Sequence, residues 1–419
     1  MSASALSQLF IFFLVLTFVV RCWLSIRQIR HIKAHQEKVP EQFVGNISLA
    51  SHRKAAAYTV AKTRLSLVSL IVETVVLLGF TLFGGLEKLS DWVLGWTGND
   101  MIYQIALIAL TSIIVGAIDL PLDYWRQFVL EEKFGFNKMT PALFVGDIFK
   151  SAILGIIIGL PVIWVLLTVM GKAGTWWWLY AWILWTIFQY LMLFLYPTFI
   201  APLFNKFTPL QDEQLRLKIE DLMKRVGFQS KGLFVMDGSK RSAHGNAYFT
   251  GFGGAKRVVF FDTLIEKLSP EEIEAVLAHE LGHFRLKHVM KRMIATSVLS
   301  LVFLAILGYL KNQSWFYAGL GVVSIPTGGS DAVALILFAL TLPIFTFFLS
   351  PVMAISSRKH EFEADAFSAQ YTQADDLIHA LVKMYQDNAS TLTPDPLHSA
   401  FYDSHPPASQ RINHLMGHS

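Results

Sequence analysis

The stretch VLAHELGHFRLKH, residues 276–288, places two histidines and a glutamate in a helix-like run just before a continuously apolar segment, Met293 to Leu310. The run begins with helix-start signals, because Ser269 can cap, Pro270 suits the first helical position and Glu272 completes a capping box. Apolar residues then recur at helical spacing: Ile273, Val276, Leu277, Leu281 and Phe284. The stretch therefore predicts a helix that carries polar chemistry and leads directly into a membrane span.

The two histidines have the spacing of a metal site. His279 and His283 are four residues apart, so both imidazoles leave one face of the helix and can share one ion. Glu280 lies beside that face, where it can take a proton from a water activated by a metal. The alternative is a set of ordinary polar helix residues, because this pattern arises by chance in about one per cent of chains of this size. His288 follows half a turn away in a regular helix, so we expect it to face away and exclude it as a ligand.

A third protein ligand is expected, since catalytic zinc usually takes three side chains plus water. SRKHEFEADAFSAQY, residues 357–371, offers Glu361 and Asp365, four apart on one helix face. Glu361 can ligate zinc, and Asp365 can accept a hydrogen bond from a ligating histidine and fix its tautomer. Spacing alone leaves Glu361 one of several nearby carboxylates, and a solvated helix start, which Glu363 fits well, is the alternative. Cys22 is the single cysteine, which excludes an intrachain disulfide and a cysteine-based zinc site.

The composition is that of an integral membrane protein. Of the 419 residues 53% are hydrophobic and only 16% are charged, against about 25% charged in soluble domains. The formal charge of +4 is too small to indicate nucleic acid as a partner. Windows of about 20 apolar residues can span a bilayer. Seven windows qualify: Ala5–Leu24, Leu65–Leu86, Met101–Leu122, Ile148–Met170, Thr175–Pro197, Met293–Leu310 and Ala332–Ala354.

The basic residues predict the orientation of these spans. They concentrate in the loops after the first, third and fifth spans, whereas the other loops offer little beyond Lys88, Lys172 and Lys311. We therefore expect the N-terminus outside and the C-terminus in the cytoplasm. Residues 9–20 lack a preceding basic residue and a cleavage pattern, which indicates a retained first span. The tail NHLMGHS carries no recognisable retrieval signal, so both a bacterial inner membrane and the endoplasmic reticulum are open.

Several stretches together resemble one family. HELGH, SRKHEFEADAF and YDSHPPASQRINHL (residues 402–415) occur in the order found in the CAAX prenyl proteases of type 1, which are membrane-embedded zinc metallopeptidases. EEKFGFNKMTP (131–141), APLFNKFTPL (201–210) and GSKRSAHGNAYFTGFG (238–253) are also similar to that family. The resemblance implies one Zn²⁺ per chain on His279, His283 and Glu361. It also implies that Glu280 is general base and acid and that Asp365 orients a ligating histidine.

The resemblance also singles out Asn246, His405 and Arg411 as residues that line the cleft near the scissile bond. His405 and Arg411 can donate to the developing oxyanion, and Asn246 can hold the substrate main chain. Structural roles remain open for two of them. His405, before Pro406 and Pro407, can simply terminate a helix, and Arg411 can simply pair with a surface carboxylate.

The expected fold is mainly α, with seven transmembrane helices and a small α+β zincin-like protease domain on the cytoplasmic side. The family resemblance implies that the seven helices surround a large chamber. We expect five spans in residues 1–200, the protease domain in 201–292, spans six and seven in 293–355, and a tail that completes the active site in 356–419. KGLFVMD (231–237), NAYFTGF (246–252) and RVVFFDTLI (257–265) read as short strands. An exposed edge strand that starts at Asn246 and Ala247 can accept an extended peptide by strand addition.

The apolar windows contain polar residues that a passive anchor does not need: Glu73, Gln104, Asp119 and Gln189. Acids inside a membrane usually face protein or water, so a cavity is expected. For Glu73 a hydrogen bond between two helices is an equally good interpretation.

The leading functional hypothesis is an endopeptidase that acts near the C-terminus of prenylated proteins or on related hydrophobic peptides, with the bilayer as its second partner. An alternative is a membrane quality-control zinc protease, which shares HELGH and the EFEAD-type motif but has fewer spans and no SHPP tail. A catalytically silent transporter or scaffold is a third hypothesis, and the intact Glu280 argues against it.

Overall fold

The structure, a computed structural model, is described for residues 1–97, 100–230, 232–250, 257–324 and 331–417. Within these residues, 7 helical segments are long and apolar enough to cross a membrane, which confirms the expected number. The segments are built from α1 (Ala3–His35), α2 (Leu49–Phe80), α4 (Asp100–Trp125), α6 (Pro141–Leu154) with α7 (Leu160–Lys172), α8 (Trp177–Leu195), α13 (His288–Leu310), and α15 (Asp331–Thr346) with α16 (Ser350–Tyr371). The chain is therefore an integral multi-pass membrane protein.

The second span ends earlier than expected. The apolar window runs to Leu86, but α2 stops at Phe80 and Leu86 lies in a separate helix, α3 (Gly85–Leu94). Gly84 adopts φ 71°, a left-handed conformation that favours glycine. A Cβ on Gly85 would lie 2.4 Å from the carbonyl oxygen of Gly79, so the tight reversal requires glycine there as well. Hydropathy does not detect such a turn because both sides of it are apolar.

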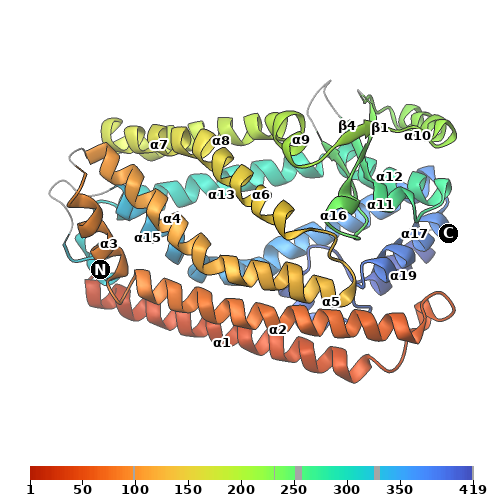
Figure 1. Cartoon of the computed structure of the whole chain (residues 1–419), viewed down its shortest axis with the longest axis horizontal. Coiled ribbons are helices and arrows are strands. Elements are labelled where there is room, and N and C mark those ends of the chain that lie inside the picture. Colours follow the sequence, from red (N-terminus) through yellow and green to blue (C-terminus); the bar gives the residue numbers. More distant parts are fainter. Residues whose placement is uncertain (98–99, 231, 251–256, 325–330, 418–419) are drawn as a thin grey trace.

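The spans contact one another in a closed ring: α1 with α2, α2 with α4, α4 with α7, α7 with α8, α8 with α13, α13 with α15, and α15 with α1 (Figure 1). One large apolar cluster gathers the span ends away from the sheet, with Phe10 of α1, Phe80 of α2, Leu107 of α4 and Leu337 of α15 among its members. Because lipid tails are as apolar as these side chains, close van der Waals packing, and not transfer out of water, stabilises this contact between the spans. The ring is therefore closed by packing at one end, and the protease domain lies at the other.

The protease domain contains a small mixed sheet of the order β1-β2-β4-β3. Its strands are β1 (Phe207–Pro209), β2 (Leu233–Met236), β3 (Ala247–Thr250) and β4 (Arg257–Phe261); β2 and β4 are parallel and the other pairs antiparallel. β2, β3 and β4 lie within the three predicted strands, of which residues 231, 251 and 252 fall outside the described part of the chain, and β3 is an edge strand as expected. β1 was missed, because it is short and contains a proline.

The third predicted strand is too long, because Asp262–Ile265 forms a helical turn, α11. The Asp262 carboxylate accepts hydrogen bonds from the backbone N–H groups of Thr263 and Ser239 at 2.8 and 2.9 Å. These bonds favour a helix start over a continued ladder.

The motif residues lie on α12 (Pro270–Arg285) and α16. Four further helices pack around these two: α10 (Glu213–Val226), α17 (Ala374–Asp387), α18 (Pro396–Tyr402) and α19 (Ala408–Met416). α12 begins at the predicted capping box of Ser269 and Glu272. Its apolar residues Ile273, Val276, Leu277 and Leu281 are buried, whereas Phe284 near its end is exposed. The helix packs against α16, α17 and α10. Short helices complete the chain: α5 (Glu132–Phe134), α9 (Ala201–Phe204) and α14 (Ser314–Gly319).

Candidate metal centre

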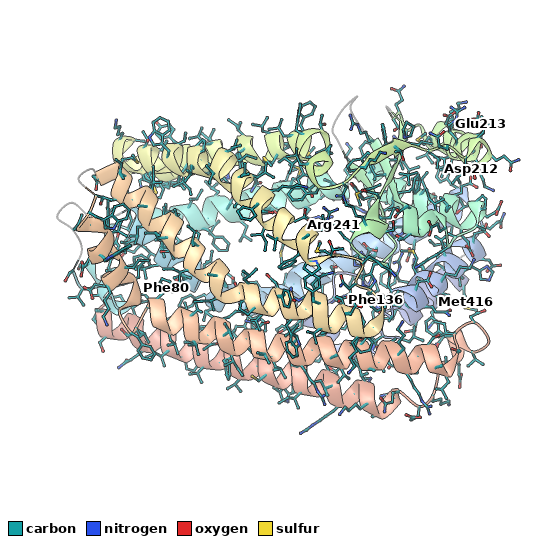
Figure 2. The ribbon with its side chains drawn as sticks, viewed as in Figure 1. Phe80, Phe136, Asp212, Glu213, Arg241 and Met416 are labelled. Carbon is teal, nitrogen blue, oxygen red and sulfur yellow. The ribbon has the colours of Figure 1, made fainter. Side chains whose placement is uncertain are left out.

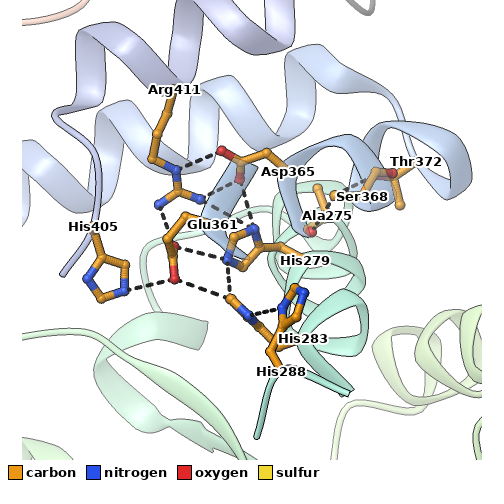
Figure 3. A network of polar contacts seen from close by, with 10 residues as sticks. All are labelled: Ala275, His279, His283, His288, Glu361, Asp365, Ser368, Thr372, His405 and Arg411. Carbon is orange, nitrogen blue, oxygen red and sulfur yellow. Dashed lines mark hydrogen bonds and ion pairs between the residues drawn. The ribbon is translucent and has the colours of Figure 1, made fainter. Parts of the chain in front are cut away.

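The crossing of α12 and α16 brings three potential metal ligands together (Figure 3). His279 and His283 come from successive turns of α12, and their Nε2 atoms are 3.2 Å apart. Glu361 of α16 presents Oε1 at 3.3 Å from Nε2 of His283 and Oε2 at 3.5 Å from Nε2 of His279. Two of the three side chains, His279 and Glu361, are buried.

The spacing of these atoms fits a tetrahedral ion. Ligand atoms about 2.05 Å from one tetrahedral ion lie roughly 3.3 Å from one another, and the three separations observed are 3.2, 3.3 and 3.5 Å. Oε2 of Glu361 is buried and accepts no hydrogen bond from the part of the chain that the structure describes. A buried carboxylate oxygen without such a partner is costly unless a cation satisfies it. The donor set therefore fits a divalent metal.

Asp365 orients His279, one turn after Glu361 on α16. Oδ1 of Asp365 lies 2.8 Å from Nδ1 of His279. Because a carboxylate only accepts, the proton of this imidazole resides on Nδ1 and leaves a lone pair on Nε2. The tautomer that can bind a metal is the one that this contact favours.

Arg411 of α19 lies behind the same pair and is also buried. Its Nε donates to Oδ2 of Asp365 at 2.9 Å and its Nη2 donates to Oδ1 at 2.5 Å, a bidentate pair. Burial opposes its charge, but Asp365 and Glu361 raise the pKa of Arg411 above its usual value, so the guanidinium stays charged. The carboxylate partner of Arg411 is a buried residue, not a surface one. Its expected contact with an oxyanion stays a prediction.

His405 lies on the open side of the site, in the segment between α18 and α19. Its Nε2 is 3.4 Å from Oε1 of Glu361, and its side chain is 61% exposed. Ser404 lies against the other ring nitrogen, with Oγ 3.0 Å from Nδ1. His405 does follow the end of α18, yet its ring is directed to the metal ligands. An exposed imidazole at this distance is within reach of a bound peptide.

Glu280 follows His279 on α12 and is half-buried. Burial raises the pKa of its carboxyl, an effect that His279 and His283 oppose and Glu361 reinforces. A raised pKa makes the ionised carboxylate a stronger base than it is in water. This environment suits a group that must both take and return a proton.

Asn246 lies at the start of β3 and is exposed. Its carbonyl oxygen accepts from the N–H of Phe261, which makes Ala247 and Phe260 a non-hydrogen-bonded pair. The N–H of Ala247 therefore points away from β4, where the side-chain oxygen of Asn246 accepts it at 2.8 Å. Since β3 also contacts α12, this edge runs along the metal-ligand helix.

His288 contacts the site, contrary to the expectation that it faces away. Its Nδ1 lies 3.0 Å from Nδ1 of His283. The helical extrapolation fails because α12 ends at Arg285 and Lys287 adopts φ 58° before α13 begins at His288. His288 is nonetheless not among the three donors that converge. A left-handed lysine leaves no signal in the residue pattern.

Residues that the sequence did not single out fix the loop before β3 to the membrane helices. Arg241, which is labelled in Figure 2, makes a bidentate pair with Asp147 of α6, with Nε–Oδ2 2.9 Å and Nη2–Oδ1 3.1 Å. It also donates to Asn205. His244 lies 3.5 Å from Glu131 of the third span, and Tyr58 of α2 donates to the same carboxylate at 2.6 Å. The loop before β3 is thereby positioned from the membrane region.

The polar residues inside the spans have two kinds of surroundings. Glu73 pairs with Arg21 of α1 at 3.1 Å, and both line a cavity of about 250 Å³ with Asp119, so both interpretations of Glu73 hold. Gln104 is buried and accepts from the N–H of Ala332, which makes it a link between helices. Gln189 is half-buried in α8. The larger chamber that the family resemblance implies stays a prediction.

A second cavity reaches His405. It has a volume of about 540 Å³ and lies between α1, α2 and the segment that contains His405. Its wall includes Arg21, Tyr58, Lys62 and His405. The cavity therefore lies beside His405, on the open side of the site.

Comparison with known proteins identifies the family. Residues 28–206 match the CAAX prenyl protease N-terminal region of five membrane helices, and residues 209–419 match peptidase family M48. The chain is 36% identical to a CAAX prenyl protease 1 homolog of Arabidopsis thaliana, over 97% of this chain and 96% of the relative. It is 33% identical to the CAAX prenyl protease 1 of Saccharomyces cerevisiae, over 96% of this chain and 93% of the yeast protein. The crystal structure of S. mikatae Ste24p superimposes with a TM-score of 0.91 at 32% identity, over 98% of this chain and 99% of that one. The chain therefore belongs to the CAAX prenyl protease type 1 family and is a membrane-embedded metalloprotease of peptidase family M48.

Proposed function

We propose that this chain is an endopeptidase that holds one Zn²⁺ on His279, His283 and Glu361. The observation that carries the proposal is the spacing of the donors: the two Nε2 atoms are 3.2 Å apart, and each lies 3.3 or 3.5 Å from one oxygen of the Glu361 carboxylate. The buried Oε2 of Glu361 also accepts no hydrogen bond from the described chain. When bound, such an ion polarises a carbonyl and lowers the pKa of a water. The residues around it supply the rest of the chemistry.

Glu280 takes the proton of the attacking water and returns it to the leaving amine. Its carboxyl group interacts electrostatically with His279, His283 and Glu361, the residues that would hold the ion, and its raised pKa suits both steps. Asp365 holds His279 in the ligating tautomer, and Arg411 holds Asp365. A general base of this kind contributes typically 10²–10⁴-fold to the rate.

His405 donates from the open side of the site to the oxygen on which charge develops. Arg411 contributes there through Nη1, which lies 3.7 Å from Oε2 of Glu361 and donates no hydrogen bond within the described part of the chain. The substrate lies along β3 as an added strand, with Asn246 bound to its main chain. In this arrangement the enzyme recognises mainly the extended backbone of the substrate and only modestly its side chains.

The substrate class we propose is a peptide bond near the C-terminus of a prenylated CAAX protein or of a related hydrophobic peptide, cut on the cytoplasmic face. Support comes from the full-length similarity to relatives named CAAX prenyl protease 1, and from a site at one end of a ring of membrane helices. The same full-length similarity, seven spans and the SHPP tail favour this class over a quality-control protease. The charged site around Glu280 disfavours a silent scaffold.

Cleavage of matched farnesylated and unmodified peptides that end in a CAAX box tests the substrate class. We expect a higher kcat/KM for the farnesylated peptide. Equal rates for both would indicate the broader, quality-control type of substrate. The metal assignment is tested separately by Glu361→Ala, which should lower zinc content; unchanged content would reject Glu361 as a ligand.

A further inference from the structure

A second group of polar residues lies directly behind the metal ligands and has no role in the function proposed above. His288, at the start of α13, is only 1% exposed, and its Nδ1 is 3.0 Å from Nδ1 of His283. On its other side, Nε2 of His288 lies 2.9 Å from Oε2 of Glu363 on α16. The two contacts form a continuous chain from α16 through α13 to α12.

Glu363 fixes the direction of the protons in this chain. A carboxylate can only accept, so the proton of His288 resides on Nε2 and Nδ1 of His288 presents a lone pair. His283 must then donate from its own Nδ1 to that lone pair. Nε2 of His283 is left without a proton and faces Glu361 and His279, where the ion belongs.

We propose that His288 and Glu363 are positioning residues that hold His283 in its metal-binding tautomer and ring orientation. The inference rests on the proposed function, because it requires His283 to be a ligand. It gives each histidine ligand a partner of its own: Asp365 for His279, and the pair of His288 and Glu363 for His283. Since α13 is the sixth membrane span, these hydrogen bonds also connect the metal centre to that span.

A second metal ion is the main alternative reading of this group. His288, His360 and Glu363 offer donor atoms that lie within 4.8 Å of one another. The rings of His288 and His360, however, are stacked 4.0 Å apart with an interplanar angle of 12°. The lone pairs of nearly parallel, stacked rings lie in separate planes that do not meet nearby, whereas two ligands of one ion must converge on it. The geometry therefore favours a hydrogen-bonded chain over a metal site.

The experiment compares the zinc affinity of full-length variants in detergent by competition with a chelator. His288→Leu removes the acceptor, His288→Asn keeps an acceptor oxygen near the position of Nδ1, and Glu363→Ala removes the far carboxylate. His360→Phe is the matched control, because it preserves the stacked ring without a donor atom. The absorption spectrum of the cobalt-substituted protein reports the ligand geometry independently of turnover.

We expect His288→Leu to weaken zinc binding by about 10–100-fold and to change the cobalt spectrum. Glu363→Ala should weaken zinc binding less, because Glu363 is partly exposed. His288→Asn should recover most of the zinc affinity. His360→Phe should match the parent, with one zinc per chain throughout. If His288→Leu does not fold, the zinc affinities of His288→Asn and Glu363→Ala relative to the parent still test the proposal.

Parental affinity in both His288→Leu and Glu363→Ala would overturn the proposal. So would a His288→Asn variant as weak as His288→Leu, or the loss of a second zinc in His360→Phe. A parent that binds no zinc at all would instead contradict the proposed function, so the two failures are distinguishable.

Discussion

Arg411 and Asp365 form a buried bidentate ion pair behind the metal ligands, with Nε–Oδ2 2.9 Å and Nη2–Oδ1 2.5 Å. The same Asp365 carboxylate lies 2.8 Å from Nδ1 of His279. The C-terminal helix α19 therefore acts on the metal centre through Asp365, although it is distant in sequence from the motif on α12. This relationship couples the stability of the fold to the orientation of a ligand.

Arg411→Met should destabilise the protein and weaken zinc binding together. The substitution leaves the Asp365 carboxylate buried without its cation, and breaking such a pair typically costs about 3–5 kcal/mol. The thermal midpoint in detergent and zinc competition measure the two effects. In Arg411→Met/Asp365→Leu much of the stability should return while zinc affinity stays low. Recovery of both would show that Asp365 does not orient His279.

His405→Ala should keep zinc but lower kcat by about 10²–10³-fold, the usual effect of removing one oxyanion donor. Zinc content and steady-state cleavage are the measurements. Ser404→Ala is the control, because it removes the contact at Nδ1 but retains the imidazole. An unaffected rate in His405→Ala would leave this residue only the role of ending α18.

Arg241→Met should lower kcat/KM without loss of zinc. The side chain binds Asp147 and Asn205 and so holds the loop before β3 in place. Small misplacements of substrate-binding elements lower the reaction rate by about 10²-fold. Lys240→Met is the matched control, since Lys240 is an exposed neighbour in the same loop. Parental kcat/KM in Arg241→Met would show that the edge strand does not depend on this tie.

Asp395→Ala should lower the thermal midpoint of the whole chain. Asp395 is 1% exposed, caps α18 through the N–H groups of Leu397 and His398, and pairs with Arg27 of α1. Loss of an N-cap alone typically lowers the free energy of unfolding by about 1 kcal/mol. The ion pair with half-exposed Arg27 contributes little more to stability. Asp395→Asn should retain most of the cap and fall between the parent and Asp395→Ala. Identical midpoints for all three would refute this assignment.

The sequence predicts the membrane region and the family well, because apolar length and local motifs carry those properties. The seven spans and the start of α12 are confirmed, since hydropathy and a capping box act within a few residues. Local patterns miss features that depend on backbone geometry. The left-handed Lys287 brings His288 against His283, and the turn at Gly84 ends the second span early.

Tertiary contacts were also beyond the reach of the residue pattern. The pair of Arg241 and Asp147 joins positions 94 residues apart, and nothing in either segment specifies the other. Arg411 resembled family residues near the substrate, but its bidentate contact with Asp365 depends on how α19 packs against α16. Packing between distant elements has no local signature, so only the folded chain defines these partners.

Glu280→Gln tests the central claim most directly, with zinc content and peptide cleavage measured on the same preparation. The amide keeps the size of the side chain but cannot accept and return a proton. The variant should retain one zinc per chain and lose about 10²–10⁴-fold in kcat. A variant that cleaves as fast as the parent while it retains zinc would contradict the account.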